Sequence, residues 1–137
     1  MAIIDINRLK PEEETSLWWI RLENETELFI DSNGNKPTPG EIEVAEASLA
    51  KIDELCIEAL KYIDIWVDRS REGIGTDNWL SSIYIYPHTR KGGQTKIQFG
   101  FTDDTDSKWW VLFNNPVPPY PGGKPRFHPI AFGREQG

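Results

Sequence analysis

The stretch that decides the fold is residues 38–68, TPGEIEVAEASLAKIDELCIEALKYIDIWVD. It opens with a helix start, because Thr38 can cap the helix, Pro39 suits its first position and Glu41 completes a capping box. Apolar residues then recur at intervals of three and four, as one face of a helix requires. These residues are Ile42, Ala45, Leu49, Ile52, Cys56, Ala59, Ile63 and Trp66. The pattern predicts one amphipathic helix of about seven turns, which is long for a small domain.

Segments typical of β-strands flank this helix on both sides. Three precede it, and a polar turn joins the second to the third, as in a hairpin. Three more follow as an antiparallel meander, and the last segment suits only a sheet edge, because Pro129 cannot donate to a central ladder. The candidate strands are residues 2–9, 16–22, 27–31, 79–86, 95–101, 108–113 and 126–132. We therefore predict a single α+β domain over residues 1–137. It has one antiparallel sheet of about five or six strands, with the long helix packed on one face.

The charge of the chain is spread unevenly. Residues 1–68 hold 16 acidic and 6 basic residues, whereas residues 69–137 hold 6 acidic and 9 basic residues. The whole chain has a net charge of −7. Such an acidic balance argues against binding to nucleic acids or to anionic membranes, and it favours a basic partner.

The cysteine content and the N-terminus bear on the compartment. Cys56 is the only cysteine of the chain, which excludes an intrachain disulfide and fits a reducing compartment. The N-terminus lacks the basic and apolar regions of a signal peptide, and no stretch approaches the ~20 apolar residues of a membrane span. We expect a cytoplasmic protein that is a monomer or a weak homodimer.

No motif for catalysis or metal binding is found. The two histidines, His88 and His128, do not combine with Cys56 into a metal-binding spacing. A calcium loop counted from Asp104 would place Trp109 where glycine is needed, so the EF-hand pattern fails. Neither a nucleophile elbow nor a phosphate-binding loop is present. We therefore predict a protein that is not an enzyme and needs no metal or cofactor.

Clustered carboxylates are the main candidates for a binding surface. On the predicted helix they lie away from the apolar stripe, and three more occupy an acidic turn between two strands. A rigid acidic surface speeds the encounter with a basic partner, although many helices simply turn a charged face to water. The candidate partner-binding residues are Glu43, Glu46, Asp53, Glu54, Glu58, Asp103, Asp104 and Asp106.

Two tryptophan pairs offer an alternative. Trp18-Trp19 and Trp109-Trp110 each place one indole on either face of a strand, so one member of each pair faces away from the core. An outward indole is covered by another part of the chain, or it stacks on a sugar or a base, or it anchors a protein interface.

The order of elements resembles a group of known proteins. Strands come first, then ELFIDSNGNKPTPGEIEVAEASLAKIDELCIEALKYI (residues 27–63), then a meander rich in Trp and Phe. Over residues 27–113 this resembles small acidic bacterial proteins of uncharacterised function. Several such groups are associated with immunity to polymorphic or contact-dependent toxins. The resemblance implies an α+β fold and a toxin-neutralising role, and it carries no binding residues over.

Together these observations favour a protein-binding domain. The leading hypothesis is an immunity protein that covers a cognate toxin, with a basic nuclease as one candidate toxin, because an acidic inhibitor gains both association rate and specificity from a basic target. The alternatives are a module that binds a carbohydrate or another small ligand through exposed Trp residues, and an uncharacterised structural domain.

Overall fold

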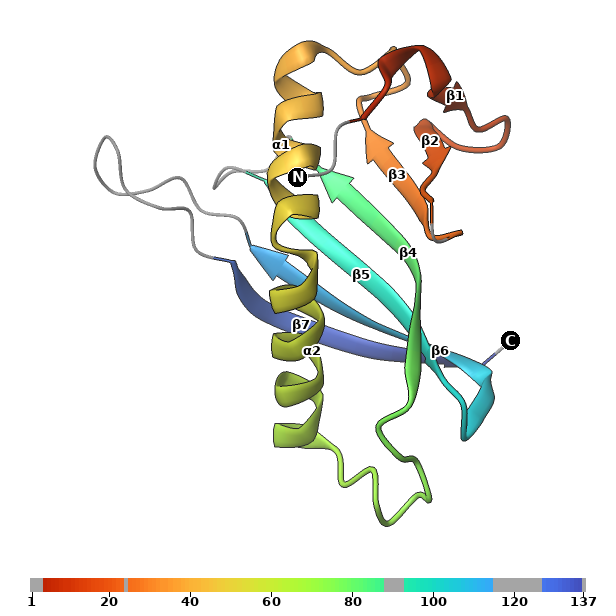
Figure 1. Cartoon of the computed structure of the whole chain (residues 1–137), viewed down its shortest axis with the longest axis vertical. Coiled ribbons are helices and arrows are strands. Elements are labelled where there is room, and N and C mark those ends of the chain that lie inside the picture. Colours follow the sequence, from red (N-terminus) through yellow and green to blue (C-terminus); the bar gives the residue numbers. More distant parts are fainter. Residues whose placement is uncertain (1–3, 24, 88–92, 115–126, 137) are drawn as a thin grey trace, which may run out of the picture.

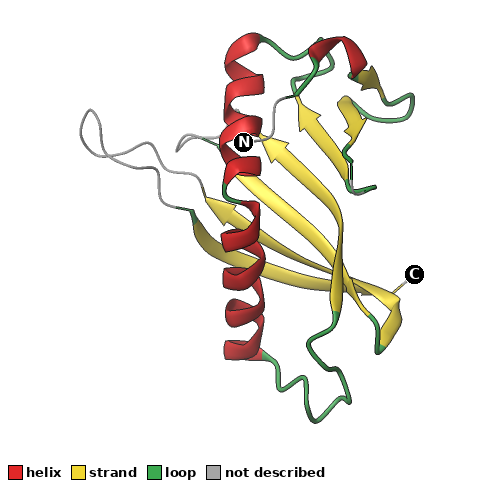
Figure 2. Cartoon of the chain, in the orientation of Figure 1, coloured by secondary structure: helices red, strands yellow, loops and turns green. Residues whose placement is uncertain are grey.

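Two helices lie against one face of a seven-stranded mixed sheet (Figures 1 and 2). The computed structural model describes residues 4–23, 25–87, 93–114 and 127–136. Its helices are α1 (Pro39–Ala50) and α2 (Ile52–Trp66), and a short 3₁₀ helix spans Ile6–Arg8. Its strands are β1 (Lys10–Pro11), β2 (Leu17–Arg21), β3 (Glu27–Asp31), β4 (Asn78–Tyr86), β5 (Gln94–Phe101), β6 (Asp104–Asn114) and β7 (His128–Gln136). The α+β prediction is confirmed.

The start of α1 is the one that the sequence predicts. The Thr38 side chain accepts a hydrogen bond from the Glu41 backbone N–H, and the Glu41 carboxylate accepts one from the Thr38 N–H at 2.8 Å. Pro39 occupies the first turn, where a missing N–H costs nothing. The complete capping box therefore fixes the N-terminus of the helix.

The prediction of one long helix is wrong, because the helix breaks at Lys51. This residue has φ −109° and ψ 9°, and its N–H bonds to the Ser48 carbonyl at 3.1 Å, three residues back. The Ser48 hydroxyl donates to the Val44 carbonyl at 3.2 Å, a bond that competes with the helical ladder and bends helices. The same hydroxyl lies 2.9 Å from the hydroxyl of Thr95 on β5. A buried polar contact with the sheet thus accompanies the break.

The break shifts the buried stripe of the helices. In α1 the core receives Ala45 and Leu49, as predicted, but in α2 the stripe advances by four residues at a time through Leu55, Ala59 and Ile63. Ile52 and Cys56 are consequently only half-buried, and Trp66 is 64% exposed. The prediction that Trp66 packs on the sheet is therefore wrong.

The sheet differs from the prediction in strand number and direction. It has seven strands in sequence order, and β3 pairs with β4 in parallel, whereas all other neighbours are antiparallel. After β3 the chain runs back along one face of the sheet through α1 and α2 (Figure 1). It therefore enters β4 from the end of the sheet where β3 begins, and the two strands run in the same direction. The expected strand over residues 2–9 is also wrong. Its described part holds the 3₁₀ helix, and β1 follows with two residues.

The core lies between the helices and the inner face of the sheet. Alternate residues of the central strands are fully buried there, including Ile83, Ile97 and Val111. Trp109 points into this core with 1% of its surface exposed, whereas Trp110 points to the other face and is half-buried. This alternation confirms that the tryptophan pair divides between the two faces. Pro129 lies on the edge strand β7, as predicted, beside a register shift at Phe113.

Candidate functional site

The sheet face opposite the helices is the most distinctive surface of the described residues. Side chains that face the helices from β3 to β6 are buried, whereas the intervening ones, which face away, are mostly half-buried. We call this outer surface the open sheet face and define it by Trp19, Phe29, Trp79, Tyr84, Tyr86, Lys96 and Trp110. Strand alternation places most of these residues together, because each points out of the same side of the pleat. The register shift between Leu80 and Ser82 brings Trp79 to the same side.

An aromatic row crosses the open sheet face. The strand register places Trp19 opposite Phe29, and Phe29 opposite Tyr84. The rings of Phe29 and Tyr84 stack with centroids 4.8 Å apart and an interplanar angle of 11°. Tyr84 and Tyr86 lie nearly parallel, at 8° and 6.5 Å. Three strands, β2, β3 and β4, therefore present adjacent ring surfaces.

A lysine lies at the centre of these rings. Lys96, on β5, is paired in register with Tyr84, and its Nζ lies 4.4 Å from the Tyr84 ring centroid and 5.7 Å from that of Trp110. Both distances fall within the range of cation–π attraction. Beside it, the amide of Gln94 donates to the Asn114 side-chain oxygen at 3.1 Å. The centre of the face thus combines one cation with aromatic rings and paired amides.

Two glycines let indoles lie flat on the open sheet face. A Cβ built on Gly100 would collide with the ring of Trp79, and one built on Gly133 would collide with the ring of Trp110. Each indole therefore lies directly over the backbone of a neighbouring strand. Trp79 keeps 45% of its surface exposed in this position. The two rings form flat apolar platforms that are open to a ligand or a partner.

Carboxylates surround the aromatic row. Burial, and then the charge of Glu12, raise the pKa of Tyr84, with smaller contributions from Glu27 and Glu135. Burial, followed by the neighbouring Tyr84 and the charge of Asp31, likewise raises the pKa of Tyr86. Both phenols therefore stay protonated at neutral pH and can donate hydrogen bonds. We call Glu12, Glu27, Asp31 and Glu135 the acidic rim.

The carboxylates that the sequence singles out on the helix are mostly exposed to water. Glu43, Asp53, Glu54 and Glu58 are exposed, with Lys51 3.7 Å from Glu54 and Lys61 3.6 Å from Glu58. Pairs this exposed contribute little to stability. Glu46 has a structural contact instead, because its carboxylate accepts a hydrogen bond from the Ile4 N–H at 3.0 Å.

The three aspartates of the β5–β6 turn lie at the opposite end of the molecule from α1 (Figure 1). Asp103 accepts a bond from the Gly75 N–H at 2.9 Å. Asp104 accepts bonds from the Trp109 indole at 2.9 Å and from the Arg134 guanidinium at 3.0 Å. Asp106 is exposed. The structure therefore separates these residues from the acids of α1, and two of them hold the turn in place.

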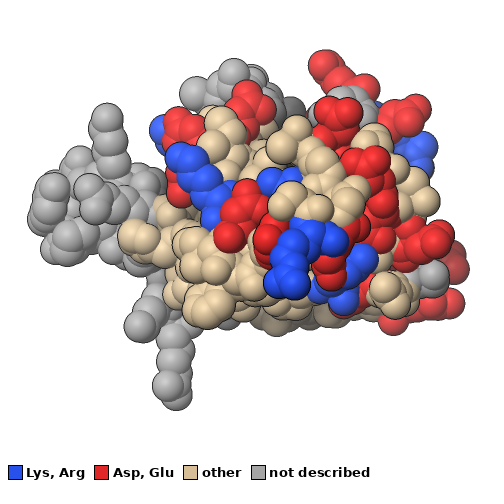
Figure 3. All heavy atoms as spheres, turned by 90° about the horizontal axis from the view of Figure 1, so that it is seen from below, with Lys and Arg blue, Asp and Glu red and all other residues tan. Residues whose placement is uncertain are grey.

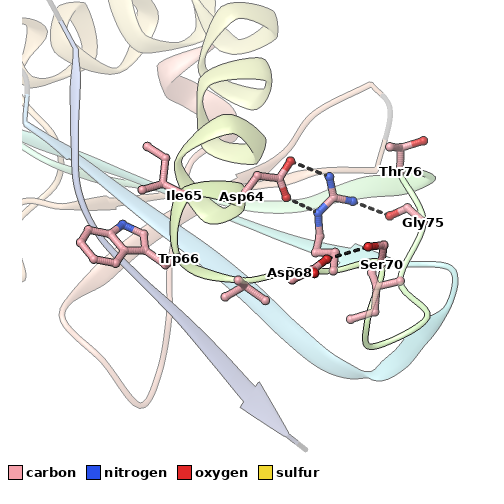
Figure 4. A pocket seen from close by; sticks show the side chains of 10 residues that line it. Asp64, Ile65, Trp66, Asp68, Ser70, Gly75 and Thr76 are labelled. Carbon is pink, nitrogen blue, oxygen red and sulfur yellow. Dashed lines mark hydrogen bonds and ion pairs between the residues drawn. The ribbon is translucent and has the colours of Figure 1, made fainter.

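A hollow of about 660 Å³ lies at the C-terminal end of α2 (Figure 4). Arg69 forms part of its lining. Its guanidinium donates to both oxygens of Asp64, at 2.7 and 2.9 Å, and to the Gly75 carbonyl, and it lies 5.2 Å from the Phe101 ring centroid. The hydrogen bond and charge of Arg69 lower the pKa of Asp64. Arg69 thus has partners within the chain and serves to hold the loop over residues 69–75.

Charges of both signs are interleaved at this end of the molecule, as the view from below shows (Figure 3). Arg134 bridges Asp104 and Glu72, the latter at 3.5 Å, and Arg69 pairs with Asp64. Because these acids have cationic neighbours, this end is not a purely acidic surface. A basic partner gains less from electrostatic attraction here than beside the unpaired acids elsewhere.

The described residues offer little for metal or thiol chemistry. They contain no group of three His, Cys, Asp or Glu side chains that could hold a metal ion. Burial, together with the charge of Asp53, raises the pKa of Cys56 to about 11. The thiol therefore stays protonated at neutral pH and is a poor nucleophile. Among the described helices none is long and apolar enough to cross a membrane.

The open sheet face was not among the predicted binding residues. The sequence predicts that one member of each tryptophan pair faces away from the core, and the outward positions within residues 82–86 and 94–98 follow from alternation once the inner face is known. The missing information was which face the helices cover. No family model, curated protein or solved structure matches the chain, so its resemblance to proteins of toxin immunity stays a prediction.

Proposed function

We propose that this chain is a protein-binding domain that captures a basic partner protein on its open sheet face. The observation that carries the proposal is a row of half-buried aromatic rings that neither helix covers and that the acidic rim surrounds. In its most specific form, the domain is a cytoplasmic immunity protein, and the partner is its cognate toxin.

Aromatic residues are the usual anchors of protein interfaces. Trp, Tyr and Arg dominate the small set of residues that provide most of the binding energy, and polar residues at the rim exclude water around them. The open sheet face has this composition, with Tyr84 and Trp110 at its centre and carboxylates at its edge. Its rings already stack on one another, so little conformational entropy is lost when a partner covers them.

The acidic rim selects the kind of partner. Carboxylates around an apolar centre attract Lys and Arg and repel other acidic surfaces. A toxin that cleaves nucleic acids must attract phosphates and is therefore basic. Covering its substrate-binding surface with an acidic domain of net charge −7 would both speed association and block the substrate. This mode of action needs no cofactor.

The test is calorimetric binding to the C-terminal domain of the protein encoded immediately upstream. Tyr84→Ala removes a central ring, and we expect the affinity to fall by about tenfold or more. The matched control is Tyr62→Ala, which removes an equal ring from α2, on the other side of the sheet. Both variants are first compared with the wild type by circular dichroism. Equal losses for the two, or no binding of the wild type, would contradict the proposal.

A second candidate function is carbohydrate binding. The observation in its favour is that Trp79 and Trp110 lie flat over Gly100 and Gly133, a geometry that suits stacking on sugar rings. Quenching of tryptophan fluorescence across a panel of oligosaccharides tests it. A saturable response that Trp110→Ala abolishes would favour this function over protein binding.

A further inference from the structure

We infer that Lys96 fixes the position of the bound partner by pairing with one carboxylate at the centre of the partner's basic surface. The inference rests on the proposed function and names a group that the partner must supply. It follows from the place of Lys96 on the open sheet face and from the cost of covering an ammonium group.

Lys96 has ring contacts but no carboxylate partner within the described parts of the chain. Its Nζ lies 4.4 Å from the Tyr84 centroid and 5.7 Å from the Trp110 centroid. The ion pairs between described residues involve Lys51, Lys61, Arg69 and Arg134, each with an acid on its own side of the fold. None of the described residues accepts a hydrogen bond from the Lys96 ammonium, so this group is left to water before a partner binds.

A partner that covers the aromatic row removes this water. An ammonium group that loses its water without gaining a counter-charge is strongly unfavourable, and ring contacts alone do not replace three hydrogen bonds. The neighbouring Gln94 and Asn114 side chains are neutral amides, so they cannot supply a counter-charge. The counter-charge must come from the partner, and a carboxylate supplies it together with a hydrogen-bond acceptor.

The acidic rim limits how many carboxylates the partner can present. Besides burial, the charge of Glu12 and, to a smaller extent, those of Glu27 and Glu135 raise the pKa of the Tyr84 phenol, so these charges reach the centre of the face. A second acidic group that came close to Glu12, Glu27 or Asp31 would be repelled. The matching surface is therefore basic around its edge and carries one Asp or Glu opposite Lys96. That arrangement excludes shifted docking positions and gives specificity.

Lys108 provides a matched control on the same face. It alternates with Trp110 along β6, it is exposed, and it lies opposite Glu135 in the register of β6 and β7. Its ammonium can keep its water when the centre of the face is covered. Lys96→Met and Lys108→Met remove the same charge, and methionine keeps most of the apolar contact of the lysine stem.

The experiment measures the affinity of the upstream-encoded toxin domain for the wild type, Lys96→Met, Lys96→Gln and Lys108→Met. We expect both Lys96 variants to lose about tenfold or more, mainly through faster dissociation, and Lys108→Met to lose less than about threefold. Thermal unfolding of each free variant separates a loss of folding from a loss of binding. Unchanged or tighter binding of both folded Lys96 variants would overturn the inference.

A charge swap identifies the partner's carboxylate. Lys96→Glu should weaken binding by about a hundredfold, and one Asp→Lys or Glu→Lys substitution in the toxin domain should restore much of it. Restoration by none of the toxin's acidic positions would overturn the inference, while loss of binding in Tyr84→Ala would still support the proposed function. No binding of the wild-type domain would overturn both.

Discussion

At the residue scale, the buried Arg69 shows how one side chain can organise a loop. Its side chain is 9% exposed, whereas the side chain of its partner Asp64 is 48% exposed. The two partners of this ion pair thus differ in their access to water. Removal of Arg69 leaves the Asp64 carboxylate, which water can hydrate. Removal of Asp64 leaves the Arg69 guanidinium, which is largely shielded from water.

We therefore expect Asp64→Ala to destabilise the fold more than Arg69→Met. The first leaves a buried guanidinium without its counter-charge, at a cost of about 2–4 kcal/mol, whereas the second leaves a carboxylate that water can reach, at about 1–2 kcal/mol. Urea denaturation of both variants measures the difference. The opposite order would show that Asp64 contributes little and that the contacts of Arg69 with Gly75 and Phe101 dominate.

The ionisation of Asp104 makes the stability of the fold depend on pH. Burial opposes ionisation, but the hydrogen bonds from Trp109 and Ser107 and the charge of Arg134 lower the pKa of Asp104 below its ordinary value of 3.8. Because the folded pKa is the lower one, the stabilisation is present above the unfolded pKa and is lost as the pH falls through the folded pKa. Asp104→Asn should be less stable than the wild type at pH 7, and this difference in stability should narrow as the pH falls below 3.8. If the difference in urea midpoint between Asp104→Asn and the wild type stayed constant over this pH range, this role of Asp104 would be contradicted.

Gly133 determines where the Trp110 indole lies. A methyl group at this position would enter the space of the ring, so Gly133→Ala should move the indole away from β7. We expect a changed tryptophan emission spectrum and weaker partner binding, with a modest loss of stability. Gly73→Ala offers a comparison away from the face, although the positive φ of 72° at Gly73 adds strain of its own. An unchanged spectrum in Gly133→Ala would mean that the indole adjusts in place.

At the scale of the element, the start of α1 depends on a single side chain. The Thr38 side chain accepts a hydrogen bond from the Glu41 N–H, and the Thr38 N–H donates one to the Glu41 carboxylate. Thr38→Ala should reduce the free energy of unfolding by about 1 kcal/mol, and Thr38→Asp should retain most of it, because Asp also caps. Chemical denaturation measures both. Equal losses in the two variants would show that the cap contributes nothing beyond the threonine's own packing.

The break at Lys51 ties the helices to the sheet. Ser48 is fully buried, yet its hydroxyl reaches both the Val44 carbonyl and the Thr95 hydroxyl. A buried hydroxyl is stable when its hydrogen bonds are satisfied, and here they are. This buried contact lies at the point where the helical sequence divides into α1 and α2.

At the scale of the whole molecule, the net charge and the open sheet face have separate roles. Charge acts at a distance and sets the rate of encounter, whereas the aromatic rings act at contact and set the lifetime of the complex. The exposed acids of the helices lie on the other side of the sheet from the rings. They can therefore steer a basic partner without touching it.

We expect Glu43→Lys, Glu54→Lys and Glu58→Lys, combined in one variant, to slow association by about tenfold at low salt and to leave dissociation nearly unchanged. Glu46 is kept, because its carboxylate holds the Ile4 N–H. Stopped-flow kinetics at two salt concentrations provide the measurement. Faster dissociation would place these acids within the interface and move it to the helices.

The sequence by itself determined the local features. The capping box, the strands of the meander, the edge position of Pro129 and the alternation of Trp109 and Trp110 all follow from short-range geometry, and the structure contains them. These features depend on neighbours a few residues away, so their signals are complete within the chain.

Only the tertiary structure decided the rest. The helix break is accompanied by the contact of Ser48 with Thr95, 47 residues away, and the exposure of Trp66 goes with the shifted stripe. The parallel pairing of β3 and β4 depends on the path of the crossover. The open sheet face exists because both helices cover the same side. Such facts arise from contacts between distant segments, which the periodicity of any one segment cannot specify.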